Sequence, residues 1–162
     1  MVSFGSKEQG VSLIELMVTI TILSILVLAG TSLTGQWSKQ AELDKATMSL
    51  KSGVSLARSI AIRNEFPHQT AYIASQICFN KVDKELSVHK ATATDSASCS
   101  TPVAFKYPLS STIEIKDTNG TKFKCFAFNN FGQVMNVATA NCKSNLTLII
   151  SNGSLNEILT LN

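Results

Sequence analysis

The chain has 162 residues and a formal net charge of +3, with 14 Lys and Arg against 11 Asp and Glu. This length suits one domain with an appendage. The cations are scattered, which excludes a polybasic arm or a dense nucleic-acid patch. Charged residues make up only 15% of the chain and hydrophobic residues 44%, so we expect the apolar residues to be concentrated in one segment.

That apolar segment lies near the amino terminus, where no charged residue occurs between Leu16 and Ser38. As a helix rising 1.5 Å per residue it would extend roughly 35 Å, which is enough to cross a bilayer. A short polar stretch, residues 1–10, precedes it, and there Lys7 is offset by Glu8. Three interpretations compete for this region: a secretory signal peptide, a plain membrane anchor, or a leader that is removed ahead of a retained helix.

Glu15 separates the three interpretations. Val27-Leu28-Ala29 resembles the small-residue site of ordinary signal peptidase, which favours a secretory signal. An ionised carboxylate early in the apolar region, however, costs about 2.5–3.5 kcal/mol on insertion scales. A plain anchor has the same cost and gives the glutamate no use. The third interpretation therefore depends on a purpose for Glu15.

The stretch Gly10-Val11-Ser12-Leu13-Ile14-Glu15-Leu16-Met17 resembles the prepilin motif of type IV pilins and type II secretion pseudopilins. The resemblance implies cleavage after Gly10 by prepilin peptidase and methylation of the new amine on Val11. The family favours Phe at this first position, so Val11 is a departure. Glu15 becomes the fifth residue, where its carboxylate can neutralise its own amine or that of a neighbouring subunit. In a low-dielectric bundle such a pair can set the axial register of assembly.

The next stretch, residues 36–65, has good helix formers and a stripe of positions spaced three and four apart. The stripe consists of Leu43, Thr47, Leu50, Val54, Ala57 and Ala61. Pro67 ends this run, because the residue before a proline is pushed toward extended geometry. We therefore expect a transmembrane helix over 11–35 that continues into the head over 36–66. Weak points or close approaches are expected at Gly30, Gly35 and Gly53.

After Pro67 the sequence turns to short runs of β-branched and aromatic residues, at 70–80, 86–91, 103–109 and 112–128. Asn119-Gly120 and Asn152-Gly153 each predict a β-hairpin. The second hairpin should place one apolar face toward the helix, and Glu157 shares that face and breaks its pattern. The apolar members are Leu146, Leu148, Ile150, Leu155, Leu159 and Leu161. A long amino-terminal helix packed on an antiparallel sheet is an α+β fold, and it is the pilin plan.

Four cysteines lie in the expected β-rich head, residues 67–162: Cys78, Cys99, Cys125 and Cys142. They form no CxxC motif or Cys/His cluster, so the sequence does not indicate zinc. An even number downstream of a membrane segment fits disulfides in an oxidising compartment such as a bacterial periplasm. Of three possible pairings we favour the sequence-local one, Cys78–Cys99 with Cys125–Cys142, at about 3 kcal/mol of stabilisation each. Four buried free thiols are the alternative.

No catalytic constellation is evident, and we expect neither an enzyme nor a metal or other cofactor. His68 and His89 lie in polar stretches that predict surface positions. Asp117-Thr118-Asn119-Gly120 resembles the start of a calcium loop, but no Glu follows at the required distance, so a turn is expected.

Three further segments resemble the GspH/FimT group of pilin-like proteins. They are Leu56-Ala57-Arg58-Ser59-Ile60-Ala61-Ile62-Arg63, the Phe-x-x-x-Gly turn of Phe128 to Gly132, and the apolar hairpin from Leu146 to Leu161. An interface role for Arg58 and Arg63 and a solvated helix face are equally compatible with the pattern. Some members carry a Gly-Arg-x-Arg tail that binds DNA, and the sequence given has no match to it. The other candidates for phosphate binding, Lys116, Lys122 and Lys124, sit among acids, so nucleic acid is not favoured as a partner.

The resemblance implies a minor pilin of a type IV pilus, acting in the initiating or tip complex. Its expected partners are other minor and major pilins, the inner-membrane assembly platform and prepilin peptidase. It would cross the bacterial inner membrane once, with its head in the periplasm, before entering the pilus. The corresponding pseudopilin of a type II secretion system is the alternative. A periplasmic binding module released from an ordinary signal peptide is a third possibility, from a different class.

Overall fold

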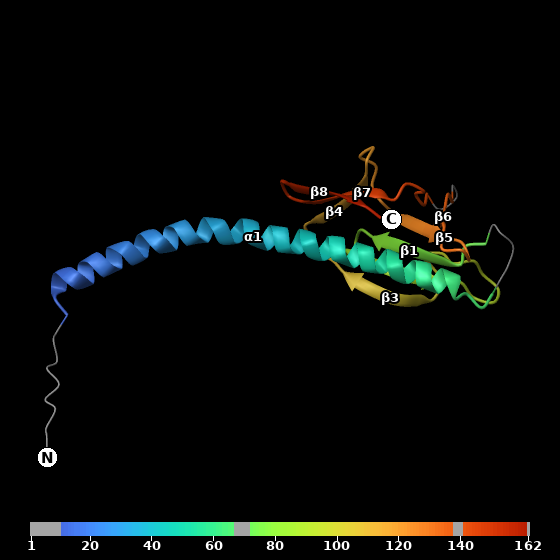
Figure 1. Cartoon of the computed structure of the whole chain (residues 1–162), viewed down its shortest axis with the longest axis horizontal. Helices are drawn as coiled ribbons and strands as arrows, with labels where there is room; N and C mark the ends of the chain where they lie inside the picture. The colour runs from blue at the N-terminus through green and yellow to red at the C-terminus, as the bar shows by residue number, and fades with distance from the viewer. Residues whose placement is uncertain (1–10, 67–71, 138–140, 162) are drawn as a thin grey trace, which may run out of the picture. The chain divides into compact units, whose positions relative to one another are not determined.

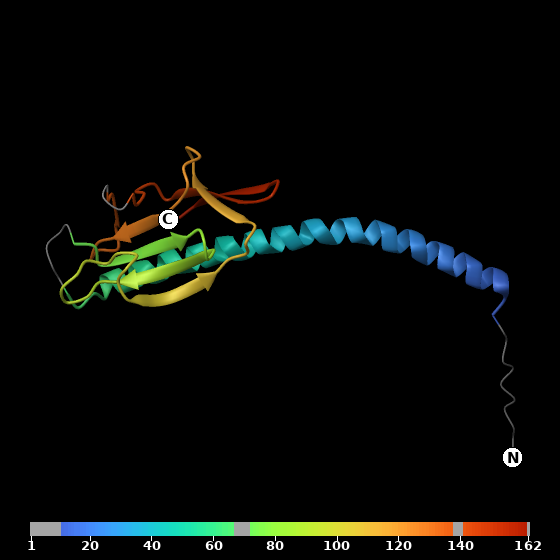
Figure 2. The same cartoon turned by 180° about the vertical axis from the view of Figure 1, so that it is seen from behind.

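The computed structural model describes residues 11–66, 72–137 and 141–161. The chain forms two compact units, Met1–Ser38 and Lys39–Asn162, and we call the second unit the head. Helix α1, Leu13–Ile62, runs from the first unit into the second. Within the head, the described chain then forms only strands, β1 to β8, which lie in two antiparallel sheets (Figures 1 and 2). The predicted α+β fold, one long helix packed on antiparallel sheets, is confirmed.

The head half of α1 packs through one apolar stripe. All six predicted positions, Leu43, Thr47, Leu50, Val54, Ala57 and Ala61, are no more than 4% exposed. Ala46 is also buried and widens the stripe. Because steps of three and four keep side chains on one helical face, this stripe directs the helix onto both sheets, whose apolar residues share its core.

Helix α1 ends at Ile62, earlier than the predicted boundary at residue 66. Asn64 explains the difference. Its side-chain oxygen accepts a hydrogen bond from the Phe66 amide at 3.3 Å, and its side-chain nitrogen donates to the Phe66 carbonyl at 3.1 Å. Such local bonds compete with the helix for backbone groups, so the turn begins before Pro67, which lies outside the described residues.

The larger sheet has the strand order β3-β2-β1-β5-β6. Its strands are β1 (Ser75–Asn80), β2 (Glu85–Lys90), β3 (Val103–Pro108), β5 (Cys125–Phe128) and β6 (Val134–Met135). In β1, Ile77 faces the helix, and a Cβ placed on Gly53 would lie 2.7 Å from the Ile77 Cδ1 atom. At Gly53, where the sequence predicted a weak point or a close approach, helix α1 therefore packs closely against the larger sheet.

The smaller sheet has the order β4-β7-β8, formed by β4 (Ile113–Asp117), β7 (Thr147–Asn152) and β8 (Leu155–Thr160). The β7–β8 hairpin is confirmed, and its turn uses Gly153 at φ +64°. Its predicted inner face is confirmed too, because four of its members are buried: Leu148, Ile150, Leu159 and Leu161. Glu157 shares this face and accepts a hydrogen bond from the Thr47 hydroxyl at 2.8 Å. Thr47 and Glu157, one polar residue from each apolar surface, thus satisfy each other.

The Asn119-Gly120 turn forms, but the hairpin predicted around it is largely wrong. Asp117 donates its amide to the Thr121 carbonyl, and Gly120 has φ +77°. Beyond the turn, however, only the single bridge between Lys116 and Lys122 joins the two arms. Strand β4 pairs with β7, and β5 pairs with β1, so the arms enter different sheets. The turn therefore connects the sheets.

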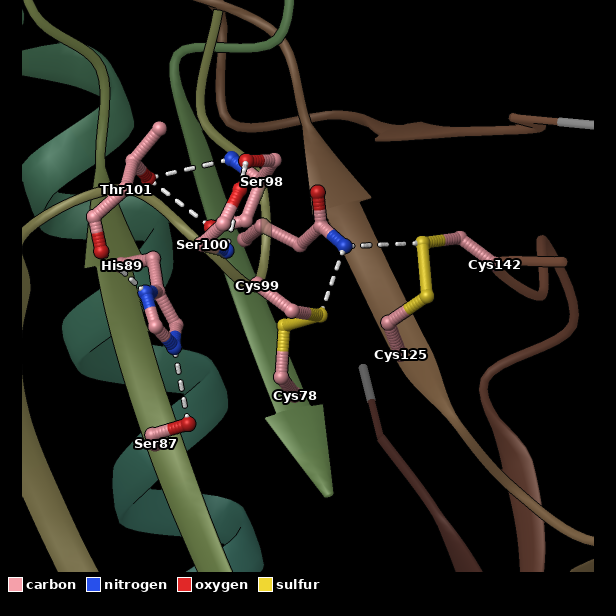
Figure 3. The surroundings of a disulfide bond; sticks show 10 residues. Cys78, Ser87, His89, Ser98, Cys99, Ser100, Thr101, Cys125 and Cys142 are labelled. Carbon is pink, nitrogen blue, oxygen red and sulfur yellow. Dashed lines mark hydrogen bonds between the residues drawn. A yellow bond between two sulfur atoms is a disulfide. The ribbon is translucent and has the colours of Figure 1, made fainter. Parts of the chain in front are cut away.

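Two disulfides lie side by side on the face of the larger sheet that points away from the helix (Figure 3). They are the sequence-local pairs, Cys78–Cys99 and Cys125–Cys142, and the chain has no free cysteine. Cys78 and Cys125 are direct partners on β1 and β5. The Gln76 side-chain nitrogen lies 3.2 Å from the sulfur of Cys99 and 3.3 Å from that of Cys142. The bridges hold the segments that carry Cys99 and Cys142 against this face.

Candidate functional site

The described part of the first unit is a mostly apolar helix that nothing in the unit covers. Every side chain from Val11 to Gly30 is exposed, with Leu28 at 75% and Leu13 at 76%. Exposed apolar surface of this extent marks a membrane or an interaction site. In the described part of the chain, α1 is the one helix long and apolar enough to cross a membrane by length and composition.

Three hydroxyl groups of this segment are satisfied within the helix. Thr19, Thr21 and Ser24 donate to the carbonyls of Leu16, Met17 and Ile20 at 2.7–2.9 Å. This back-bonding leaves those hydroxyls without need of water. These polar residues are therefore compatible with a hydrocarbon environment, which leaves Glu15 as the residue that requires an explanation.

Glu15 lies in the first turn of α1. The helix opens with a hydrogen bond from the Leu16 amide to the Ser12 carbonyl at 3.1 Å. A carboxylate there is favourably placed toward the positive end of the helix dipole. Among the described residues, the Glu15 carboxylate makes no hydrogen bond or ion pair. The predicted cleavage residue Gly10 lies outside the described residues, and Val11 is the first residue of the described chain.

The predicted weak points Gly30 and Gly35 do not interrupt α1. A Cβ at either position would meet nothing within 4 Å. No contact between described residues therefore requires these glycines. Small residues on an apolar helix do allow another helix to approach closely.

Several head residues picked out from the sequence have structural partners. The Arg58 guanidinium carbon lies 5.9 Å from the centroid of the Phe128 ring, so Arg58 is not simply a solvated charge. Arg63 is exposed. The Asp117 carboxylate accepts hydrogen bonds from the amides of Asn119 and Thr121, which confirms the predicted turn.

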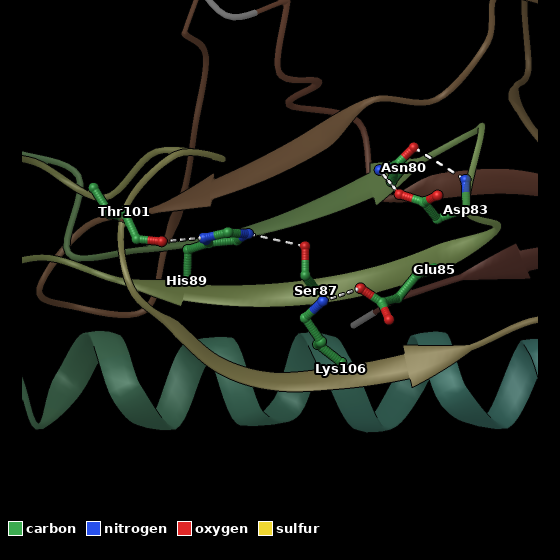
Figure 4. Close-up of polar contacts among 7 residues, drawn as sticks. All are labelled: Asn80, Asp83, Glu85, Ser87, His89, Thr101 and Lys106. Atoms are coloured by element: carbon green, nitrogen blue, oxygen red, sulfur yellow. Dashed lines mark hydrogen bonds and ion pairs between the residues drawn. The ribbon is translucent and has the colours of Figure 1, made fainter.

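His89 corrects one prediction and adds a pair that sequence reasoning missed. The prediction of a surface position is wrong, because His89 is only 4% exposed. Its Nδ1 lies 2.7 Å from the Thr101 carbonyl oxygen and its Nε2 lies 2.9 Å from the Ser87 hydroxyl (Figure 4). The available signal was the spacing of two, which puts Ser87 and His89 on one face of β2.

His68 lies outside the described residues. No group of three or more His, Cys, Asp or Glu within the described ranges is arranged to hold a metal ion.

Comparison with known proteins identifies one family motif. Residues 5–31 match the model of the prokaryotic N-terminal methylation motif. No curated protein and no solved structure matches the chain. The match includes Gly10, Val11 and Glu15, and it coincides with the start of the apolar helix. Motif and fold together support a type IV pilin-like protein, anchored by its amino-terminal helix and structural in character.

Proposed function

We propose that this pilin-like chain is a minor pilin of a type IV pilus, which helps to initiate the filament or forms part of its tip complex. One observation carries the proposal: an acidic side chain, Glu15, stands in the first turn of an exposed apolar helix, inside the matched methylation motif. The pilin fold of the described residues is consistent with it. The low-copy role rests on the resemblance of the head to the GspH/FimT group.

Processing would create the partner that Glu15 needs. Prepilin peptidase would cut after Gly10 and the amine of Val11 would be methylated. Residues 11–35 would anchor the subunit in the bacterial inner membrane with the head in the periplasm. From there the assembly platform would pass it to other minor and major pilins.

The spacing of Val11 and Glu15 suits a register device. Helix α1 begins at Leu13, and a processed chain that is helical from Val11 would separate the amine and Glu15 by about 6 Å along the axis. A neighbouring subunit can therefore place its own amine opposite Glu15 after a defined axial shift. Removing one member of a buried ion pair costs about 3–5 kcal/mol, because the other charge stays unpaired. A subunit with a misplaced carboxylate would thus be rejected from the bundle.

The head would carry the contacts particular to this subunit. The Arg58 segment, the turn at Gly132 with φ +72° and the β7–β8 hairpin are the features similar to the GspH/FimT group. Arg58 and Gly132 are close in space, since a Cβ on Gly132 would lie 3.8 Å from the Arg58 Cβ. Two features of that group therefore meet at one end of the head helix.

The test is incorporation of a Glu15→Ala variant into filaments in the host. Sheared pili should contain at least tenfold less of this variant, while the membrane fraction holds a normal amount. Glu65→Ala, which removes an exposed carboxylate from the head, is the matched control and should be incorporated normally. Normal incorporation of Glu15→Ala would refute the register role.

A deletion of the gene distinguishes the pilus from the secretion system. Loss of surface pili with protein secretion intact supports the minor pilin. Loss of secretion with pili intact would assign the chain to the pseudopilin alternative, which shares every motif above.

A further inference from the structure

We propose that the face of the larger sheet turned away from the helix is a binding groove for an acidic saccharide or sugar phosphate: a ligand that joins an anionic group to neighbouring hydroxyls. The groove has a volume of about 610 Å³ and is lined by β1, β2, β3 and β5 and by the turns next to them. Its polar residues divide into a cationic rim and a hydrogen-bonding floor. The proposal concerns the head alone and holds whichever assembly the chain enters.

The rim carries an excess of positive charge. Four lysines line the groove, Lys81, Lys106, Lys122 and Lys124, together with the two acids Asp83 and Glu85. Both acids already have partners inside the protein. Glu85 pairs with Lys106 at 2.8 Å, and Asp83 accepts a hydrogen bond from the Asn80 side chain at 2.6 Å (Figure 4).

Three rim lysines make no ion pair with a described residue. The acid that acts on Lys81 and Lys122 is Glu114, and it is paired with Lys116 at 2.7 Å. In the described ranges no carboxylate lies within ion-pair distance of Lys81, Lys122 or Lys124. Lys81 and Lys122 line the same groove, and the Lys81 side chain is the main cause that lowers the pKa of Lys122. Two adjacent ammonium groups repel each other, and an anion bound between them would relieve that repulsion. Ammonium groups suit carboxylate or phosphate oxygens as point-charge donors.

The floor of the groove offers a hydrogen-bond acceptor. The Thr101 carbonyl can only accept, so His89 in its neutral form must carry its proton on Nδ1. Its Nε2 then accepts from the Ser87 hydroxyl. The single proton of Ser87 is thereby used, and its oxygen keeps an unused acceptor site. Ser87 and His89 both line the groove.

The combination selects the ligand class. A ligand that only brings negative charge would satisfy the lysines and leave Ser87 unused. A ligand that carries hydroxyls as well as an anionic group can donate to Ser87 Oγ while its anionic oxygens accept from the rim lysines, because all of these groups line one groove. Uronic acids and sugar phosphates share this chemistry. The backbone of DNA has no such hydroxyl and matches the rim alone.

Calorimetric titration of the full chain in a nonionic detergent tests the proposal. The probes are trigalacturonic acid, glucose 6-phosphate, the neutral sugar galactotriose and a single-stranded DNA 12-mer. We expect both anionic sugars to bind, with affinity that falls as salt is added, and galactotriose to show no heat of binding. Failure of both anionic sugars at millimolar concentration overturns the proposal, and so does tighter binding of the DNA.

Variants locate the site. Lys81→Gln with Lys122→Gln should weaken both anionic sugars about tenfold or more, as expected for loss of charge-assisted hydrogen bonds. Lys45→Gln with Lys51→Gln removes the same charge from exposed positions on α1 and should change affinity less than twofold. Ser87→Ala should weaken both sugars and leave any residual binding of the DNA unchanged. Equal losses of affinity in the two double variants would show that the overall charge of the protein attracts the sugars, and would overturn the proposed binding groove.

Discussion

The contact between Thr47 and Glu157 should make a measurable contribution to the stability of the head. It joins α1 to β8 through a 2.8 Å hydrogen bond from the hydroxyl to the carboxylate, and Thr47 is 4% exposed. Thr47→Val keeps the shape of the side chain and removes the hydroxyl that donates to Glu157. A hydrogen bond to a charged group contributes about 1.5–3 kcal/mol, and an unsatisfied partner raises the loss. We expect Thr47→Val to destabilise the head by about 2 kcal/mol.

A second substitution, Glu157→Leu, should restore most of the stability that Thr47→Val removes. Glu157→Leu adds an apolar side chain to the inner face of β7 and β8, and in this single variant Thr47 can bond a carbonyl of its own helix. Replacing both partners by apolar groups of similar shape is close to neutral. The double variant should therefore lie within about 1 kcal/mol of the parent, with a coupling energy of at least about 1 kcal/mol.

Thermal unfolding followed by near-ultraviolet circular dichroism measures these differences in the full chain in detergent. For a head of this size, 1 kcal/mol corresponds to about 3–5 °C in Tm. Thr47→Val should thus lower Tm by about 6–10 °C. Ser55→Val, at an exposed position of the same helix, should leave it nearly unchanged. Additive losses in the double variant would refute the proposed pairing.

Three further predictions concern the head. Replacing Cys78 and Cys99 by Ser should cost about 3 kcal/mol through the added entropy of the unfolded chain, and an unchanged Tm would contradict this. Gly53→Val should cost about 1–3 kcal/mol because the new side chain overpacks the helix–sheet contact, whereas the exposed control Ser52→Val should not; equal effects of the two substitutions would contradict the overpacking. The pKa of Asp117 is lowered, mainly by its hydrogen bond to Lys143 and also by backbone amides. Its stabilising effect is therefore present above about pH 4, the usual range for an unfolded Asp, and is lost as the pH falls through the lower folded pKa. Asp117→Asn should accordingly be less stable than the parent at neutral pH and equally stable in strong acid, and a constant difference across this range would rule out the linkage.

The elements that follow from local periodicity could be predicted from the sequence. The stripe from Leu43 to Ala61 identifies the buried face of the helix, and the alternation of Leu146 to Leu161 identifies that of the last hairpin. Both depend only on which side chains share a face. The helix end was placed too late, because the side-chain bonds of Asn64 stop the helix before the proline.

Pairing between distant strands could not be predicted. Asn119-Gly120 specifies a turn, and a turn does not determine where its arms go. β5 leaves that turn to pair with β1, a choice made by packing across the whole head. The burial of His89 was missed for a related reason. Alternation in β2 puts it on a polar face, and the segment tethered by Cys99 packs beside His89 and supplies the Thr101 carbonyl.

The candidate site around Glu15 could be predicted from the sequence because its signal is local: a glycine, a change from polar to apolar residues, and one glutamate. The structure adds that three surrounding hydroxyls are satisfied in the helix. What Glu15 contacts in a filament depends on a second subunit, which neither the sequence nor a single chain contains.

Mass spectrometry of the protein recovered from host membranes and from sheared pili tests the central claim most directly. We expect a chain that starts at Val11 with a methyl group on its amine, present in both fractions. A chain that keeps residues 1–10 and never enters a fibre, or one that starts at Gly30, would contradict it.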